Sequence, residues 1–203
     1  MKVAATSVTT GRPYRMQARA RAAAETGESI LDAAAAVFWE RPLKDIPLDE
    51  VARRAGVSVQ TVIRRYGGKD GLFTAATKRE DERIRRQRDQ ARVGDLAGAV
   101  RVLVDHYEEV GTGVLRLLAE EDNVPGLRGL TDRGRAHHRD WCTRVFAPAL
   151  ANRRGVERER RLAQLVAVTD VLVWKLLRRD RGLSRKQTEL ALRELLEPLL
   201  GGT

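Results

Sequence analysis

The chain of 203 residues is poor in strand-forming residues and in cysteine, and it has no long apolar run. Aromatic residues make up only 4% of it, while alanine, leucine, arginine and glutamate dominate, which favours helices. Its one cysteine, Cys142, excludes an internal disulfide and fits a reducing compartment. No apolar run approaches the roughly 20 residues of a membrane helix, and no signal peptide is evident. We therefore expect an all-α, soluble protein of the cytoplasm.

Acidic residues are absent from the start of the chain, and the net charge of the whole chain is +10. The basic residues among the first 22 positions are Lys2, Arg12, Arg15, Arg19 and Arg21. We interpret residues 1–22 as a basic arm that can be disordered in isolation. The arm is either an inert extension or an added contact to phosphates or to the minor groove of DNA. Charge alone also fits an ordinary soluble protein from an arginine-rich proteome.

Residues 48–66 (LDEVARRAGVSVQTVIRRY) predict a helix, a tight turn and a second helix. Apolar residues recur at helical spacing on both sides of the turn. Gly56 can adopt the positive φ that ends a helix, and the Ser58 hydroxyl can cap the next helix by accepting from its free N–H groups. A small residue, a glycine, a buried branched residue and a capping hydroxyl together are typical of a helix-turn-helix motif.

This helix pair is basic, which suits a phosphate backbone. The cations between Val51 and Lys69 are Arg53, Arg54, Arg64, Arg65 and Lys69, with no acid among them. Gln60 is the best candidate for reading a base, because its amide can pair with an adenine edge through two hydrogen bonds. Arg64 can reach a guanine or a phosphate, while the other cations position the protein and specify little.

In order and spacing, residues 26–73 resemble the DNA-binding domain of the tetracycline-repressor (TetR) family of bacterial regulators. The matching stretches are ILDAA at 30–34, VF at 37–38, VARRAGVS at 51–58, TV at 61–62 and YGGKDGL at 66–72. The resemblance implies a homodimer that places one recognition helix per subunit in successive major grooves. It also implies a cavity in a helical C-terminal domain, where a small molecule changes the separation of the two DNA-reading heads.

The resemblance, together with the chemistry of the second helix, gives a set of predicted DNA-binding residues. The set is Ser58, Gln60, Thr61, Arg64, Arg65, Tyr66 and Lys69. Two positions depart from the family pattern. Ile63 stands where a tyrosine hydroxyl usually contacts a phosphate, and Pro47 stands where a serine or threonine often caps the first helix of the motif.

Three segments follow from this interpretation: an arm at 1–22, a DNA-binding domain at 23–88, and an effector-binding and dimerisation domain at 89–203. Thr26 is predicted to cap a helix that runs to about Trp39, and a helix at 69–88 follows the motif. Further helices are predicted at 95–110, 114–121, 131–147, 157–178 and 184–196, with Pro198 stopping the last one.

Two sets of residues in the C-terminal segment are candidates for binding. Apolar residues cover a wide arc of the last two helices, which indicates either burial in the domain or a four-helix dimer interface. The predicted interface comprises Leu165, Leu172, Leu176, Leu192, Leu195 and Leu196. Between the middle helices, a ligand cavity could be lined by His106, Tyr107, Leu117, Trp141 and Phe146, which otherwise are plain core.

No cofactor, metal or catalytic residue is expected. His138 and Cys142 share a helical face and His106 could approach them, but zinc needs three or four ligands with supporting contacts. Adjacent residues on a helix point apart, so no acid–base site is preassembled. We predict a DNA-binding transcriptional repressor that binds a palindromic operator as a homodimer and is released by a small molecule. The alternative is an architectural DNA-binding protein without an effector.

Overall fold

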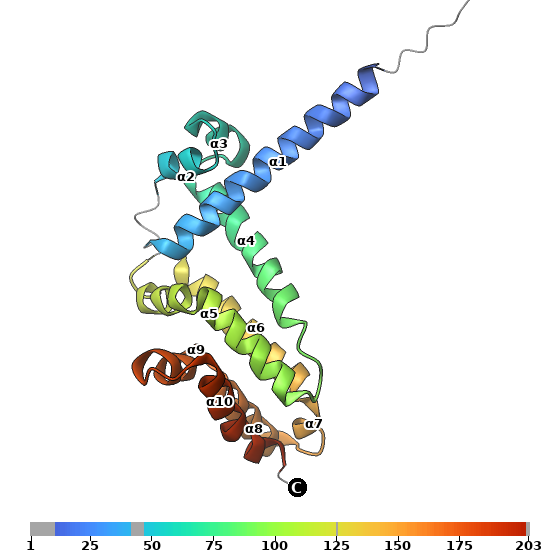
Figure 1. Cartoon of the computed structure of the whole chain (residues 1–203), viewed down its shortest axis with the longest axis vertical. Coiled ribbons are helices and arrows are strands. Elements are labelled where there is room, and N and C mark those ends of the chain that lie inside the picture. The colour runs from blue at the N-terminus through green and yellow to red at the C-terminus, as the bar shows by residue number, and fades with distance from the viewer. Residues whose placement is uncertain (1–10, 42–46, 125, 202–203) are drawn as a thin grey trace, which may run out of the picture. The chain divides into compact units, whose positions relative to one another are not determined.

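The computed structural model describes residues 11–41, 47–124 and 126–201, and those residues form helices and short connections with no strand. The expected all-α class is confirmed. The chain divides into two compact units, the first made of Met1–Val37 with Ile46–Arg79 and the second of Phe38–Asp45 with Glu80–Thr203. Figure 1 labels the helices of both units. No helix in the described part of the chain has the length and apolar character needed to cross a bilayer.

The N-terminal unit is built from four helices. They are α1 (Gly11–Glu40), α2 (Leu48–Arg54), α3 (Val59–Tyr66) and the first half of α4 (Lys69–Arg88). Ile30 and Val37 of α1, Val51 of α2 and Val62 of α3 are fully buried in its core, and Leu72 of α4 is almost so. The last turn of α1 and the second half of α4 belong to the other unit.

Helix α1 begins much earlier than the sequence analysis predicts. Thr26 is not an N-cap but lies inside the helix, where its hydroxyl donates to the Ala22 carbonyl at 2.8 Å. Residues 14–25 contain no glycine or proline, and Pro13 lies in the first turn, where proline is tolerated, so the helix extends back to Gly11. Residues 14–25 are exposed, including three of the basic residues of the predicted arm. Residues 1–10 of that arm lie outside the described residues.

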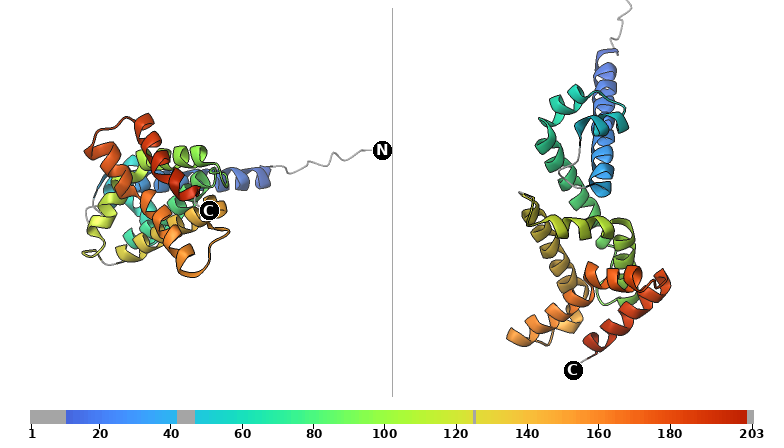
Figure 2. Two further views of the ribbon diagram at one scale, coloured as in Figure 1. Left: turned by 90° about the horizontal axis from the view of Figure 1, so that it is seen from below. Right: turned by 90° about the vertical axis from the view of Figure 1, so that its left-hand side faces the viewer.

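Six α-helices and one π-helical turn follow in the C-terminal unit. They are α5 (Leu96–Glu120), α6 (Leu127–Val145), α7 (Ala147–Leu150), α8 (Gly155–Val168), α9 (Val171–Lys175), the π-helical turn η2 (Leu176–Asp180) and α10 (Arg185–Leu200). α5 packs against α6, α9 and α10, and α8 packs against α6 and α10 (Figure 2). Leu103, Leu162, Leu165, Trp174 and Leu196 are among the buried residues of the shared core.

Several boundaries in this unit differ from the predictions, and α6 begins at Leu127, four residues before its predicted start. α5 is continuous through Gly111 and Gly113. Each of these glycines leaves room for a tryptophan ring that packs against the helix. A Cβ built on Gly111 would lie 2.6 Å from the Trp174 ring, so this glycine serves close packing and does not end the helix. The single helix predicted at 157–178 is broken before Asp170, whose carboxylate caps α9. α10 continues past Pro198, which removes one backbone N–H donor two residues before the helix ends.

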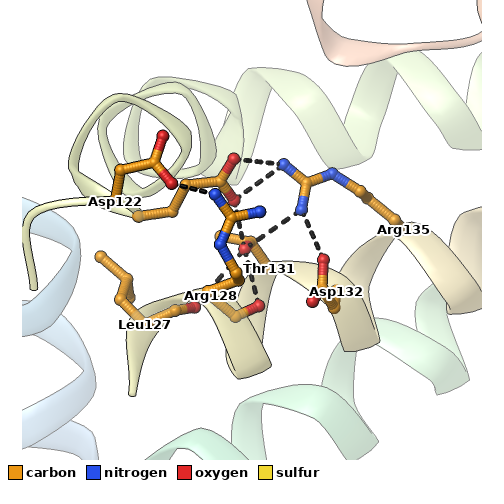
Figure 3. Close-up of polar contacts among 7 residues, drawn as sticks. Asp122, Leu127, Arg128, Thr131, Asp132 and Arg135 are labelled. Atoms are coloured by element: carbon orange, nitrogen blue, oxygen red, sulfur yellow. Dashed lines mark hydrogen bonds and ion pairs between the residues drawn. The ribbon is translucent and has the colours of Figure 1, made fainter. Parts of the chain in front are cut away.

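The connection between α5 and α6 is held by a cluster of polar side chains (Figure 3). Arg135 donates to both carboxylate oxygens of Glu121 at 2.6 and 2.7 Å and to Asp132 at 2.8 Å. The hydroxyl of Thr131 also donates to Glu121. These bonds, first those from Arg135 and then that from Thr131, lower the pKa of Glu121. The cluster thereby fixes the first turns of α6, which carries Trp141, one of the predicted cavity residues.

Candidate functional site

The helix-turn-helix motif has the geometry that its sequence predicts. Gly56 takes a φ of 67° directly after α2, and the chain reverses there. The N–H of Val57 then donates to the Ala52 carbonyl at 2.9 Å, which closes the turn. Ser58 caps α3, its hydroxyl oxygen accepting from the N–H of Thr61 at 3.2 Å. The two helices of the motif pack against each other.

One face of α3 is presented to solvent. Gln60 and Arg64 are exposed and stand four residues apart, so they lie on the same side of the helix. Arg65 and Lys69 are exposed as well, and Thr61 is half-buried with its hydroxyl 2.9 Å from that of Ser58. The structure thus exposes the amide of Gln60 and the guanidinium of Arg64 on one side of α3, with the capping hydroxyl of Ser58 at the start of the helix.

The end of α3 is anchored to α1. The hydroxyl of Tyr66, a half-buried residue, donates to the Gly27 carbonyl at 3.0 Å. The guanidinium of Arg65 lies over Gly27, because a Cβ built there would be only 2.2 Å from its Nη2 atom. Of the predicted DNA-binding residues, Tyr66 and Arg65 therefore also set the position of the recognition helix.

Further contacts hold the frame around α3. Arg79 of α4 donates to the Glu28 carboxylate of α1 at 3.0 Å and also pairs with Asp32. Ser29 donates to the Ala55 carbonyl at the end of α2, at 3.2 Å. The sequence analysis missed these supports, because contacts between residues 26 or more positions apart leave no local pattern.

Two of the cations of the motif are engaged within α2. Glu50 accepts from Arg53 at 2.8 and 2.9 Å and from Arg54 at 2.8 Å. Hydrogen bonds from Arg53 and then Arg54 lower the pKa of Glu50 to about 2. The acid-free stretch considered in the sequence begins at Val51, one residue after Glu50. The spacings of three and four residues from Glu50 to Arg53 and Arg54 nevertheless predict these ion pairs. The positive charge presented by α3 itself comes from Arg64 and Arg65.

Both departures from the family pattern have visible consequences. Pro47 precedes α2 without any side-chain cap, which leaves the first N–H groups of that helix without a hydroxyl partner. Ile63 is 39% exposed on α3, so an apolar side chain stands where the family usually offers a hydroxyl. Any phosphate contact at these places must come from neighbouring residues.

The five predicted cavity residues, His106, Tyr107, Leu117, Trp141 and Phe146, are all buried in the C-terminal unit. Three of them, Tyr107, Trp141 and Phe146, belong to one core cluster, in which the rings of Trp141 and Phe146 meet edge to face. The hydroxyl of Tyr107 donates to the Thr169 carbonyl at 2.9 Å. A hollow of about 480 Å³ lies elsewhere, along α7 and the start of α8, and none of the five residues lines it.

The six leucines of the predicted dimer interface divide into two groups. Leu165, Leu192 and Leu196 are buried within the core of the unit itself. In contrast, Leu172 and Leu176 are each 54% exposed and Leu195 is 48% exposed. The exposed three present apolar surface that a second subunit could cover.

His138 and Cys142 are neighbours, with Nε2 and Sγ 3.8 Å apart. Both are engaged with Thr169, whose hydroxyl oxygen is 3.1 Å from the His138 Nε2 and 3.3 Å from the Cys142 Sγ. Burial raises the pKa of the Cys142 thiol to about 11, so the thiol stays protonated. Within residues 11–41, 47–124 and 126–201, no group of three or more His, Cys, Asp or Glu side chains is placed to hold a metal ion.

Comparison with known proteins extends these observations. Residues 30–76 match the model of the bacterial regulatory proteins of the tetR family. The fold is similar to that of a TetR-family transcriptional regulator from Streptomyces coelicolor, with a TM-score of 0.66 and 19% identity over 87% of this chain and 95% of that chain. No curated protein matches the chain in sequence.

Two other solved structures share the fold. A transcriptional regulator from Rhodococcus sp. Rha1 has a TM-score of 0.64 and 22% identity, over 85% of this chain and 95% of that chain. A structure from Saccharomonospora viridis, described as a transcriptional regulator in complex with choline, has a TM-score of 0.60 and 18% identity, over 84% of this chain and 94% of that chain. At such identities the likeness is one of fold.

Proposed function

The chain is a member of the tetR family of bacterial regulatory proteins, with that family's helix-turn-helix domain, and we propose that it is a transcriptional repressor. In this proposal it binds a palindromic operator as a homodimer and leaves the operator when a small molecule binds its C-terminal unit. The observation that carries the proposal is the exposed face of α3, capped by Ser58 and anchored to α1 through Tyr66. A protein acting on bacterial DNA works in the cytoplasm.

Residues on and beside α3 have different roles in this proposal. Gln60 reads a base edge, and Arg64 contacts a guanine or a phosphate. Thr61 reaches the groove beside Gln60, whereas Ser58, Arg65, Tyr66 and Lys69 position the helix on the backbone. Phosphate contacts of this kind fix the register of the protein on the duplex but carry no sequence information.

We assign DNA binding to the N-terminal unit, and dimerisation and ligand binding to the C-terminal unit, which includes the end of α4 from Glu80 onward. Support for a dimer comes from the exposed leucines of α9, η2 and α10, which leave apolar side chains on the surface of the C-terminal unit. A ligand that favours a dimer with its DNA-reading heads apart weakens DNA affinity by the same factor by which DNA weakens ligand affinity.

A comparison of Gln60→Ala with Lys69→Ala tests the division of roles. Gln60→Ala should flatten the preference among operator variants by about 1–3 kcal/mol at the base it reads. Lys69→Ala should weaken binding to all duplexes alike and reduce the slope of log affinity against log salt by about 1. Binding titrations over a set of single-base operator variants at two salt concentrations provide the readout.

The opposite result, a lost preference in Lys69→Ala and a uniform loss in Gln60→Ala, would refute the assignment. Equal affinity of the unaltered protein for every duplex would instead indicate the architectural role, in which no base is read.

A further inference from the structure

Arg88, the last residue of α4, is a buried cation without a carboxylate partner. It is only 8% exposed, and its Nε atom is buried with no hydrogen-bond partner. It forms no ion pair with any described residue, although most buried charges in proteins are paired. A guanidinium in this position retains an unused donor and an uncompensated charge.

The groups that surround Arg88 in the C-terminal unit are neutral. Its Nη2 donates to the Nδ1 atom of His138 at 2.9 Å, and its Cζ lies 4.3 Å from the centre of the Trp141 ring. His138 must then be neutral and protonated on Nε2, which faces the Thr169 hydroxyl at 3.1 Å. Burial, and next to it the charge of Arg88, lowers the pKa of His138 to about 3.

His106 and Tyr107 complete these surroundings. Burial lowers the pKa of His106 well below its usual range, so its imidazole is neutral near pH 7. The Tyr107 hydroxyl is protonated and donates to the Thr169 carbonyl at 2.9 Å, and burial raises its pKa. Aromatic rings and neutral polar atoms therefore contact the guanidinium of Arg88, while the guanidinium of Arg144 donates to the backbone carbonyl of Arg88 at 3.4 Å.

The carboxylates on the adjoining segments have other partners. Asp89, the next residue in the chain, pairs with Arg144 at 2.9 Å. Glu109 of α5 pairs with Arg83 at 2.6 Å. Asp170 accepts from the N–H of Leu172 at 2.9 Å as the cap of α9. None of the described carboxylates forms an ion pair with Arg88, although the charge of Asp170 reaches this cluster and, after burial, helps to raise the pKa of Tyr107.

We propose that Arg88 is the anchor of the effector site and that the effector is a small organic carboxylate with an apolar body. This inference rests on the proposed function, since it names the class of molecule that releases the repressor. A guanidinium binds a carboxylate through two parallel N–H donors, and the aromatic side chains around it suit an apolar body. A monoanion matches the single charge of Arg88, whereas a phosphate dianion would leave one negative charge uncompensated.

The position of Arg88 gives the ligand a means of acting on the DNA-binding unit. Arg88 ends the helix whose first residue is Lys69, and that helix follows the recognition helix α3 in the chain. Binding a carboxylate requires the guanidinium to turn its free donor towards the ligand, which shifts the end of α4. A shift in α4 is therefore the physical link between the ligand and the DNA-reading heads.

Matched pairs of probes test the proposal on the unaltered protein. We would titrate acetate, hexanoate and benzoate against acetamide, hexanamide and benzamide, with choline as a cation, and follow tryptophan fluorescence and the thermal midpoint. Each amide matches its acid in size and lacks the charge. We expect hexanoate and benzoate to bind at least tenfold more tightly than their amides and choline not to bind. Equal binding within every pair would overturn the proposal.

Variants of Arg88 locate the site. Arg88→Met should lose the carboxylate response, and Arg88→Lys should weaken it about tenfold, because lysine keeps the charge but lacks the planar fork. The matched control is Arg139→Met, which removes an exposed arginine of α6 and should respond like the unaltered protein. Circular dichroism checks that each variant is folded. Full carboxylate binding in a folded Arg88→Met protein would contradict the assignment.

Adding the same probes to the complex with DNA separates this inference from the proposed function. Carboxylate binding that needs Arg88 but leaves DNA affinity unchanged would keep the site and overturn release by a ligand. Release of DNA by the amides, equally in the Arg88→Met variant, would keep the repressor mechanism and overturn Arg88 as its anchor.

Discussion

At the scale of single residues, Gly71 shows how closely the start of α4 approaches the end of α3. A Cβ built on Gly71 would lie 1.8 Å from the carbonyl oxygen of Tyr66, which is backbone and cannot rotate away. We predict that Gly71→Ala lowers the free energy of unfolding by about 1–3 kcal/mol, the usual cost of overpacking. Urea denaturation followed by circular dichroism measures this change.

The matched control for that substitution is Gly134→Ala in α6. Gly134 is exposed, and nothing lies within 4 Å of a Cβ built on it. Because alanine favours a helix interior over glycine, this change should raise the stability by about 0.5–1 kcal/mol. If both substitutions had the same effect, the contact between Gly71 and Tyr66 would not be the cause.

The buried histidines predict a loss of stability in mild acid. Histidine has a pKa near 6.5 when unfolded, whereas that of folded His138 is about 3 and that of His106 is also lowered by burial. Between these values the unfolded chain binds protons that the folded chain does not. The free energy of unfolding should therefore fall as the pH drops from about 7 towards 3, by about 1 kcal/mol per pH unit for each histidine.

His138→Gln should reduce this slope between pH 7 and pH 5, where the carboxylates with lowered pKa, Glu50 and Glu121, remain ionised. His137→Gln is the control and should change the slope less than His138→Gln. Burial lowers the pKa of His137 too, but less of that side chain is enclosed. Denaturant midpoints at a series of pH values give both slopes. An unchanged slope in His138→Gln would show that His138 is not the group that takes up the proton.

Some individual residues were predictable from the sequence and others were not. Ser58 and Gly56 act on atoms within a few residues of themselves, so their roles as cap and turn follow from local chemistry and are confirmed. Arg88 drew no attention in the sequence, because its burial depends on His138 and Trp141, which lie 50 and 53 residues further along the chain. Only the folded core brings these three together.

At the scale of elements, the caps of α3 and α10 offer a matched comparison. Ser58 accepts from the N–H of Thr61, and Ser184 accepts from the N–H of Gln187. Replacing either serine by alanine should lower stability by about 1 kcal/mol. Only Ser58→Ala should also weaken DNA binding, because it frays the first turn of the recognition helix. Denaturation and operator titration of both variants check the prediction, and equal loss of DNA affinity in both would argue against α3 as the reading helix.

The accuracy of the predicted helices varied with what defines their ends. The boundaries of α3 and the start of α10 depend on a serine cap and a local turn, and the sequence analysis placed them correctly. α5 covers the two helices predicted at 95–110 and 114–121, because Gly111, which lies between them, does not end the helix. The actual role of this glycine, contact with Trp174 more than 60 residues away, is a property of the tertiary structure.

At the scale of the whole molecule, the exposed leucines of the C-terminal unit predict self-association. Leu172 and Leu176 stand four residues apart and are each 54% exposed, so polar substitutions there should leave the core intact. The double variant Leu172→Glu/Leu176→Glu should be monomeric and should bind an operator at least 100-fold more weakly than the unaltered protein. Light scattering after size exclusion gives the mass.

The control for the double variant is Val156→Glu, at an 81% exposed position of α8 outside the proposed interface. It adds the same charged side chain to the same unit and should remain dimeric. A double variant that kept the mass of a dimer would place the interface on another face.

The central claim is that α3 reads DNA sequence, twice, in a symmetric dimer. The most direct measurement is selection of bound duplexes by the purified protein from a random library at low salt, followed by sequencing. The account predicts enrichment of an inverted repeat whose half-sites are centred about 10 base pairs, or a multiple of that spacing, apart, and loss of the enriched base in Gln60→Ala. A monomeric protein that enriched no inverted repeat would contradict it.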